Sequence, residues 1–182
     1  MYLSDKDIVA ALKRKDITIR GFDRKRLQPA SYDVLLDNKF QIVDPHLTSF
    51  VDPHHKVFPA TREVEVKDLE PFVLHPGISV LGMTRDYVGA KRKYLIQISG
   101  KSSLARAGLI VHNTAGLINP GHYLQITLEL SNMSNVPIIL RPGMEIAQLL
   151  FSKLSTPPLK DYSETGRYHG SNWEHWKPAK ET

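Results

Sequence analysis

One acidic side chain in the segment of residues 125–132 is the first candidate for catalytic chemistry. The segment reads Gln-Ile-Thr-Leu-Glu-Leu-Ser-Asn, so polar and apolar residues alternate along it, and its glutamate is Glu129. Because the side chains of a β-strand point alternately to its two faces, this strand has one apolar face and one polar face that carries Glu129. Taken alone, the pattern fits a half-exposed strand with a solvated glutamate as well as a carboxylate that moves protons in a reaction.

A second candidate is the segment of residues 99–109, Ser-Gly-Lys-Ser-Ser-Leu-Ala-Arg-Ala-Gly-Leu. Lys101 and Arg106 supply positive charge, and Ser102 and Ser103 supply hydroxyl groups beside backbone amides. These are the groups that bind a polyphosphate, and the glycine lets the backbone approach a ligand closely. The spacing of a Walker phosphate loop is not met. Residue types alone therefore leave phosphate binding and a plain capped turn both open.

The elements that must position these groups are predicted to be one short helix followed by many short strands. Ser4 can cap a helix, with Asp7 as its capping-box partner three positions on. Beyond it, short apolar runs separated by Pro-Gly and other turn residues are typical of an antiparallel sandwich or barrel. The predicted strands cover residues 32–36, 39–43, 63–66, 72–74, 78–83, 94–98, 109–112, 125–132, 137–140 and 146–152.

Length and composition indicate one domain, with or without a tail. The chain has 182 residues, of which 41% are hydrophobic and 24% charged, an ordinary globular mixture. From residue 155 onward it becomes polar and contains two adjacent prolines, so a tail is predicted there. Residues 44–60 contain a duplicated Asp-Pro-His step, which invites a metal-site hypothesis, but its spacing matches no known ligand pattern and predicts a surface loop.

Charge and cysteine content narrow the class of partner. The net charge is +5 and the pI about 9.4, which favours an anionic partner. The basic clusters are short and not interleaved with aromatic residues, so solvated surface charge is expected, not a nucleic-acid groove. No apolar run approaches the roughly 18 residues of a membrane span, and the first residues lack a signal-peptide pattern, so we expect a cytoplasmic protein without a membrane partner. The chain contains no cysteine, which excludes disulfides and thiolate metal sites.

Several motifs, in chain order, resemble those of dCTP deaminases in the dCTP deaminase/dUTPase superfamily, close to the bifunctional dCTP deaminase-dUTPases. Gly-Lys-Ser-Ser-Leu-Ala-Arg at residues 100–106 is similar to the family's Gly-Arg/Lys-Ser-Ser-Leu-Ala/Gly-Arg signature. His-Asn-Thr-Ala-Gly-Leu-Ile-Asn-Pro-Gly at residues 112–121 is similar to its next motif, and the strand around Glu129 resembles its catalytic strand. Further matches lie at residues 3–8, 28–34, 74–77 and 141–144.

The resemblance implies a mainly β fold, a distorted antiparallel β-barrel of the dUTPase-like (β-clip) type with a short N-terminal helix. Residues 1–154 would form this catalytic domain, and residues 155–182 a tail that closes over the active site. It also implies a homotrimer with sites at subunit interfaces, and hydrolytic deamination of dCTP to dUTP and ammonia, with dTTP as an inhibitor. Mg²⁺ would ride on the substrate triphosphate, and no zinc would take part, since zinc deaminases need cysteine ligands.

Three residues receive catalytic roles by this resemblance. Glu129 would be the general base that takes a proton from water as the water attacks C4 of cytosine, and would then pass protons toward the departing ammonia. Ser102 would hold the water or the leaving group, and Arg106 would orient Glu129.

The substrate contacts implied by the resemblance come from several segments. The backbone of residues 114–116 would read the base, and Lys101 and Ser103 would face the phosphates. Arg167 and Tyr168 match a pair in the family's C-terminal segment, which closes over the triphosphate. The full predicted set is Lys101, Ser103, Thr114, Ala115, Gly116, Asn119, Gln148, Tyr162, Arg167 and Tyr168.

Asn119 is a departure from the family pattern, which usually has aspartate before Pro-Gly or Ala-Gly. In the dUTPase-like members that aspartate serves the sugar and the hydrolytic machinery; an asparagine can bond a 3′-hydroxyl but cannot act as a base. We therefore expect deamination alone, with a bifunctional enzyme that continues to dUMP and pyrophosphate as the alternative. An alternative of another class is a deoxynucleotide-binding module without turnover.

Overall fold

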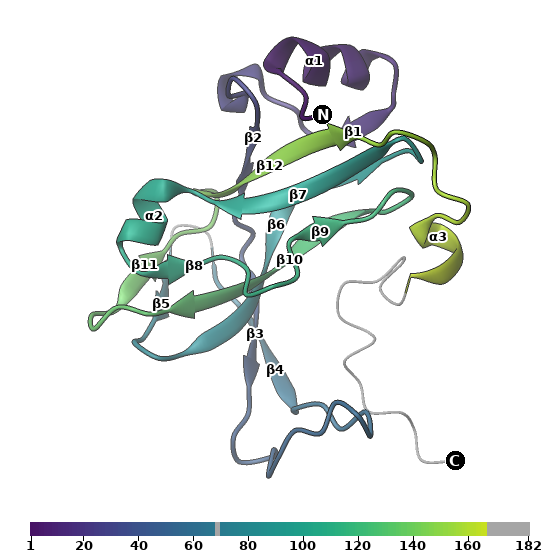
Figure 1. Cartoon of the computed structure of the whole chain (residues 1–182). Coiled ribbons are helices and arrows are strands. Elements are labelled where there is room, and N and C mark those ends of the chain that lie inside the picture. The colour runs from purple at the N-terminus through teal and green to yellow at the C-terminus, as the bar shows by residue number, and fades with distance from the viewer. Residues whose placement is uncertain (68–69, 167–182) are drawn as a thin grey trace.

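The computed structural model describes residues 1–67 and 70–166 and consists mainly of antiparallel strands (Figure 1). Helix α1, Asp5–Lys13, comes first and begins after the predicted N-cap. The Ser4 hydroxyl oxygen accepts the Asp7 backbone N–H at 3.4 Å and donates to the Asp7 carboxylate at 3.0 Å, which confirms this cap. The helix buries Ile8 and Ala11 against the sheets.

The first sheet has six strands and carries Glu129 on one of its inner members. Its order is β4-β3-β6-β10-β8, and β1 pairs with β6 outside this path. The two longest strands, β6 and β10, are paired side by side at the centre of the sheet. The strands are β1 Ile17–Ile19, β3 Lys39–Val43, β4 Thr61–Glu65, β6 Ser79–Ala90, β8 Leu109–Ile110 and β10 Tyr123–Asn132.

A four-stranded and a two-stranded sheet complete the β structure. The four-stranded sheet has the order β2-β12-β7-β9, and the small sheet pairs β11 with β5. Their bounds are β2 Tyr32–Leu35, β5 Phe72–Leu74, β7 Tyr94–Gly100, β9 Leu117–Ile118, β11 Ile138–Leu140 and β12 Glu145–Lys153. The short helices are η1 Arg24–Arg26, α2 Ser102–Arg106 and α3 Tyr162–Thr165.

The hydrophobic core joins the sheets. Leu128 and Leu130 of β10 are fully buried in the same cluster as Phe151 of β12 and Tyr32 of β2. The apolar face predicted for residues 125–132 is therefore the core face of β10. The expected mainly β fold is confirmed, although the described residues form separate distorted sheets and not a closed barrel.

The observed strands differ from the predicted ones at a few places. β6 continues to Ala90, beyond the end predicted at Met83, and β1 and β9 were not predicted. β1 and β9 are only three and two residues long, so they are defined by their neighbours in the sheet more than by their own sequence. β6 continues because the polar run after Met83 forms a β-bulge.

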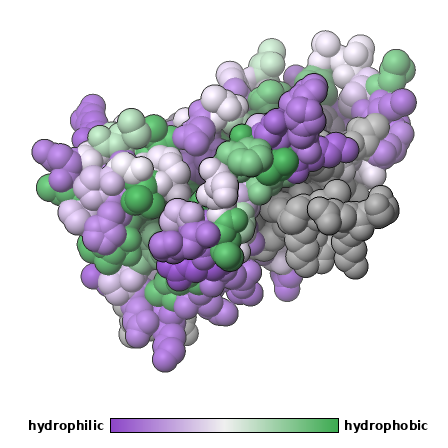
Figure 2. All heavy atoms as spheres, turned by 90° about the horizontal axis from the view of Figure 1, so that it is seen from below, coloured by the Kyte–Doolittle hydropathy of each residue, from purple (hydrophilic) through white to green (hydrophobic). Residues whose placement is uncertain are grey.

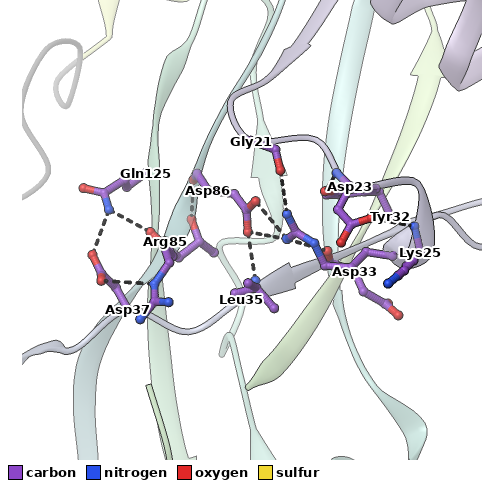
Figure 3. A network of polar contacts seen from close by, with 12 residues as sticks. Gly21, Asp23, Lys25, Tyr32, Asp33, Leu35, Asp37, Arg85, Asp86 and Gln125 are labelled. Carbon is purple, nitrogen blue, oxygen red and sulfur yellow. Dashed lines mark hydrogen bonds and ion pairs between the residues drawn. The ribbon is translucent and has the colours of Figure 1, made fainter. Parts of the chain in front are cut away.

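This β-bulge is the main irregularity between β6 and β10. Gln125 lies opposite Tyr87, and Thr127 lies opposite Met83, so three residues of β6 face Ile126 alone. Figure 3 shows the polar contacts around the bulge, with Asp86 directed at the backbone of Leu35.

The bulge residue Asp86 forms a buried ion pair with Arg26 of η1. Both oxygens of the carboxylate lie 2.9 Å from Nη1 of Arg26, and the two residues are 4% and 8% exposed. The second guanidinium nitrogen donates to the carbonyl oxygen of Gly21 at 2.9 Å. The bulge thereby ties the six-stranded sheet to the segment that precedes β2.

The β3–β4 connection, residues 44–60, extends from the lower end of the molecule in Figure 1. Its histidines His46, His54 and His55 are exposed, as expected for a surface loop. Seen from below, hydrophilic and hydrophobic residues are mixed over the surface in small groups (Figure 2). Within residues 1–67 and 70–166, no group of three or more His, Cys, Asp or Glu is arranged to hold a metal ion. The same residues include no helix that is long and apolar enough to cross a bilayer.

Candidate active site

A pocket of about 300 Å³ lies over β10 and contains Glu129. Strands β6 and β9, the loop before β9, and helix α3 form its other walls. Its lining is mainly apolar, and Glu129 is the one acidic residue among the described residues that line it. An apolar pocket with a few polar groups is the usual form of a small-molecule site. Its lining includes Leu81, Ala115, Leu117, Asn119, Thr127 and Glu129.

The Glu129 carboxylate is half-buried and held on one side. Its Oε2 accepts the backbone N–H of Asn113 at 3.0 Å, and Asn113 belongs to the loop between β8 and β9. Among the described residues, no hydrogen bond to Oε1 is found. One oxygen is thus fixed by the loop while the other is left for a ligand, which suits a group that exchanges protons with a bound molecule.

Tyr162 reaches the same pocket from helix α3. Asp161 caps this helix, and the backbone N–H of Tyr162 donates to the carbonyl oxygen of Pro120 at 2.8 Å. The Tyr162 ring packs on His122, with ring centroids 4.2 Å apart. These contacts hold the segment after β12 beside the turn that leads into β10.

Arg92 fixes α3 from the end of β6. Its guanidinium lies 2.8 Å from Glu164 and 3.4 Å from Asp161. The Ser163 hydroxyl, which donates to the Asp161 carboxylate, lowers the pKa of Asp161 most, and the charge of Arg92 lowers it further. The carboxylate therefore stays ionised well into the acid range.

A second pocket, of about 370 Å³, contains the phosphate-binding candidates Lys101, Ser102 and Ser103 together with Gln148 and Asp33. The amide of Gln148 is engaged within the chain, because its nitrogen donates to the carbonyl oxygen of Gly100 at 3.1 Å. Its Oε1 accepts the hydroxyl of Ser31 at 3.0 Å. The floor of this pocket is thus a hydrogen-bonded polar surface.

Lys101 lies between two carboxylates in the second pocket. Its ammonium nitrogen is 2.6 Å from Oδ2 of Asp33 and 2.6 Å from Oε2 of Glu145. Burial alone would lower the pKa of Lys101, but the hydrogen bonds and charges of Asp33 and Glu145 outweigh it and raise the pKa. In the isolated chain this lysine is therefore a paired cation.

The structure separates the predicted site residues into two groups. Ala115, Asn119 and Tyr162 share the first pocket with Glu129, whereas Lys101, Ser102, Ser103 and Gln148 line the second. Their roles stay predictions.

The other predicted residues line neither pocket. Arg106 is exposed on α2, and no hydrogen bond or ion pair of its side chain is found among the described residues. Thr114 is exposed in the loop before β9, and Gly116 lies against the His112 ring. Arg167 and Tyr168 lie outside the described residues.

Sequence reasoning did not include several of the residues that line the two pockets, among them Thr127, Asp33 and His122. Thr127 could have been found, because it alternates with Glu129 on the same polar face of the strand. Asp33 lies in a matched motif, but only the contact with Lys101 indicates its place in the second pocket. No pattern in the sequence indicates that His122, 9% exposed, lines the first pocket.

The family follows from a comparison over most of the chain. A family model described as dCTP deaminase-like matches residues 2–154. The chain belongs to this family. Among curated dCTP deaminase relatives, one from Salinispora tropica is named "dCTP deaminase, dUMP-forming" and is 41% identical over 97% of both chains. One of the same name from Tropheryma whipplei (strain Twist) is 46% identical over 93% of this chain and 88% of the relative.

Solved structures agree with the dCTP deaminase-like fold. The 2′-deoxycytidine 5′-triphosphate deaminase from Agrobacterium tumefaciens has a TM-score of 0.64 at 21% identity and covers 85% of this chain. This chain spans about half of that protein, 49% of its length. The native EIAV dUTPase has a TM-score of 0.51 at 16% identity, over 82% of this chain and 98% of the dUTPase. At these identities the likeness concerns the fold alone.

Proposed function

We propose that this protein deaminates dCTP hydrolytically, giving dUTP and ammonia, with Glu129 as the catalytic base. The observation that carries the proposal is the single carboxylate of the first pocket, held by the Asn113 N–H beside mainly apolar walls. Membership of the dCTP deaminase-like family supports the substrate class. The names of relatives at 41% and 46% identity support the same reaction.

The reaction needs only water and proton transfers. A water oxygen attacks C4 of cytosine while Glu129 accepts one of its protons, and a tetrahedral intermediate forms. Glu129 passes this proton to N3 of the ring, the proton of the new C4 hydroxyl is transferred to the amino group, the C4–N bond breaks, and ammonia leaves as the C4 carbonyl of uracil forms. Glu129 ends in the state in which it began, so dCTP and water give dUTP and ammonia.

The protein supplies this chemistry without the ligand set of the zinc deaminases, because the chain contains no cysteine. Activation of the water by Glu129 is part of the proposal. Mg²⁺ enters as part of the substrate, bound to the triphosphate oxygens that are its preferred ligands.

A complete site is proposed to form between copies of the chain in a homotrimer. Glu129 and the predicted catalytic pair Ser102 and Arg106 do not share a pocket within one chain. A neighbouring copy that places its α2 segment at the mouth of the first pocket would bring a hydroxyl and a guanidinium to the carboxylate. The second pocket would then supply Lys101 and Ser103 for the phosphates.

Continued hydrolysis to dUMP is a second candidate, favoured by the words "dUMP-forming" in the names of the relatives. In that case dCTP and two waters give dUMP, pyrophosphate and ammonia. Asn119 lines the pocket of Glu129, where it can bond a sugar hydroxyl but cannot take a proton from water.

The test is to incubate the protein with dCTP and, separately, with dUTP in the presence of Mg²⁺, and to separate the products by chromatography. Ammonia with dUTP supports deamination alone, while ammonia with dUMP and pyrophosphate supports the second candidate. Thermal protection by dCTP without ammonia release would instead identify a deoxynucleotide-binding module.

The variant Glu129→Gln tests, in the same assay, whether Glu129 is the general base. Loss of a general base should lower ammonia release by roughly 10²–10⁴-fold, while dCTP still raises the melting temperature of the variant. Glu63→Gln on the exposed side of β4 is the matched control and should behave as wild type. Turnover by Glu129→Gln close to that of the control would refute the assignment.

A further inference from the structure

The hydroxyl of Thr84 lies at the centre of the β-bulge between β6 and β10. Thr84 is fully buried, and its Oγ1 donates to the carbonyl oxygen of Asp86 at 2.9 Å. The same oxygen accepts the backbone N–H of Ile126 at 2.8 Å. A side chain thus takes the place of the missing ladder hydrogen bond and satisfies two backbone groups in a buried position.

The bulge decides where Glu129 lies along β6. On one side of it Gln125 pairs with Tyr87, and on the other Glu129 pairs with Leu81. If the register at Gln125 continued without a bulge, Glu129 would lie opposite Met83, since each step along β10 moves one step back along β6. The two-residue difference corresponds to about 7 Å along the strand. Leu81 lines the first pocket, so the shifted register is the one that sets Glu129 against the pocket wall.

We propose that Thr84 is a positioning residue for Glu129, acting through the backbone of β10. Its hydroxyl holds Ile126, three residues before Glu129, and its carbonyl oxygen accepts the amide of Gln125 at 3.0 Å. This inference rests on the proposed function, in which the Glu129 carboxylate must meet water and C4 of cytosine in one geometry. A displacement of about 1 Å in such an arrangement can lower the rate by 10²-fold.

Asp86, also in the bulge, has a different role from Thr84. Asp86 faces away from β10, toward Arg26 and the backbone N–H of Leu35, so it holds the segment around β2. Thr84 contacts β10 itself. The two residues therefore allow a positioning effect on the carboxylate to be separated from a general loss of stability.

The experiment compares Thr84→Val, which keeps the shape but loses the hydroxyl, with Thr84→Ser, which keeps the hydroxyl. Thr48→Val is the matched control, because the Thr48 hydroxyl also accepts a backbone N–H, that of Ala60, but in the β3–β4 loop. The readouts are kcat and KM for dCTP per folded protein, the dCTP-induced rise in melting temperature, and hydrogen exchange of the amide of Ile126.

We expect Thr84→Val to lower kcat by about tenfold or more, with KM changed by less than about threefold, because the carboxylate is displaced while most substrate contacts persist. Its Ile126 amide should exchange faster than in wild type. Thr84→Ser should restore most of kcat, and Thr48→Val should behave as wild type.

Equal kcat for Thr84→Val and Thr48→Val would overturn the inference, as would equal losses in the serine and valine variants. If wild type releases no ammonia, the proposed function fails, and the inference is then judged by exchange: an unchanged Ile126 amide in Thr84→Val overturns it, and faster exchange with a smaller dCTP-induced melting shift supports it. If Thr84→Val does not fold, Thr84→Ala is measured against the same criteria.

Discussion

At the scale of single residues, the ammonium group of Lys101, which we propose contacts the phosphates, lies between two carboxylates. It lies 2.6 Å from Asp33, which is 2% exposed, and 2.6 Å from the more accessible Glu145. If Lys101 binds phosphate as proposed, a triphosphate would have to compete with these carboxylates for the lysine. Because the pKa of Lys101 is raised in the fold by two ionised carboxylates, these ion pairs stabilise the protein at neutral and moderately alkaline pH, below the ordinary lysine value of 10.5. This contribution is lost as the pH rises through the higher folded value.

Lys101→Ala should weaken dCTP binding far more than deoxycytidine binding. A hydrogen bond to a charged group is worth about 1.5–3 kcal/mol, and deoxycytidine has no phosphate to lose it. Calorimetric titration with both ligands measures the difference. Lys153→Ala at the exposed end of β12 is the control for a general loss of positive charge. Equal weakening of both ligands by Lys101→Ala would argue against a phosphate role.

A substitution at Asn119 can test whether the lack of a carboxylate at this position limits hydrolysis of dUTP. Asn119→Asp introduces a carboxylate into the pocket of Glu129 with little change in side-chain size. If the missing acid limits hydrolysis of the triphosphate, release of pyrophosphate from dUTP should increase, while ammonia release from dCTP persists. A pyrophosphate assay on both proteins decides the point, and an unchanged rate would show that Asn119 is not the limiting residue.

At the scale of elements, the β-bulge of β6 connects this strand to two other parts of the chain. One of its side chains reaches β10, and another reaches η1 and the end of β2. The second contact is the buried ion pair of Asp86 with Arg26. If one of these charges is removed, the other stays buried, where water can hardly solvate it. Figure 3 also shows Arg85 and Gln125 directed at Asp37 on the other side of the bulge.

Asp86→Asn should lower the free energy of unfolding by about 3–5 kcal/mol, because it leaves the Arg26 charge buried without its partner. Urea denaturation followed by circular dichroism measures the loss. The control is Asp16→Asn, which breaks the exposed pair with Arg14 and should change the midpoint much less, since water screens that pair. Similar losses in the two variants would mean that burial does not govern the contribution of these pairs.

At the scale of the whole molecule, the proposed catalytic groups are separated within one chain: Glu129 lines the first pocket, Ser102 lines the second, and Arg106 lines neither. In a symmetric oligomer one copy can present its α2 segment to the Glu129 pocket of the next, and every site is then completed in the same way. Arg106, exposed on α2, would acquire its partner only in such an assembly.

Mixed assemblies test this arrangement. Coexpression of Glu129→Gln with Ser102→Ala, each inactive alone, should restore about a quarter of wild-type ammonia release, because random mixing joins the two intact halves in that share of sites. Coexpression of Ser102→Ala with Arg106→Ala should restore none, since both changes lie on the same segment. Absence of recovery in the first mixture would contradict the proposal that Glu129 and Ser102 of one site come from different chains.

The sequence by itself determined the elements whose signals are local. Alternation along residues 125–132 predicted the strand and its core face, and Ser4 predicted the start of α1, because side-chain direction and capping depend on residues a few positions apart. The motifs likewise predicted the family, because each motif is a short run of consecutive residues that can be recognised without the fold.

Only the tertiary structure decided which distant groups meet. The partners of Lys101 are 68 and 44 positions away, and Thr84 lies 42 positions before the amide that it accepts. The β-bulge turned a polar run that had ended the predicted strand at Met83 into part of a continuous β6. Such contacts depend on strand register and on burial, which a chain acquires only when its sheets pack together, so no local pattern contains them.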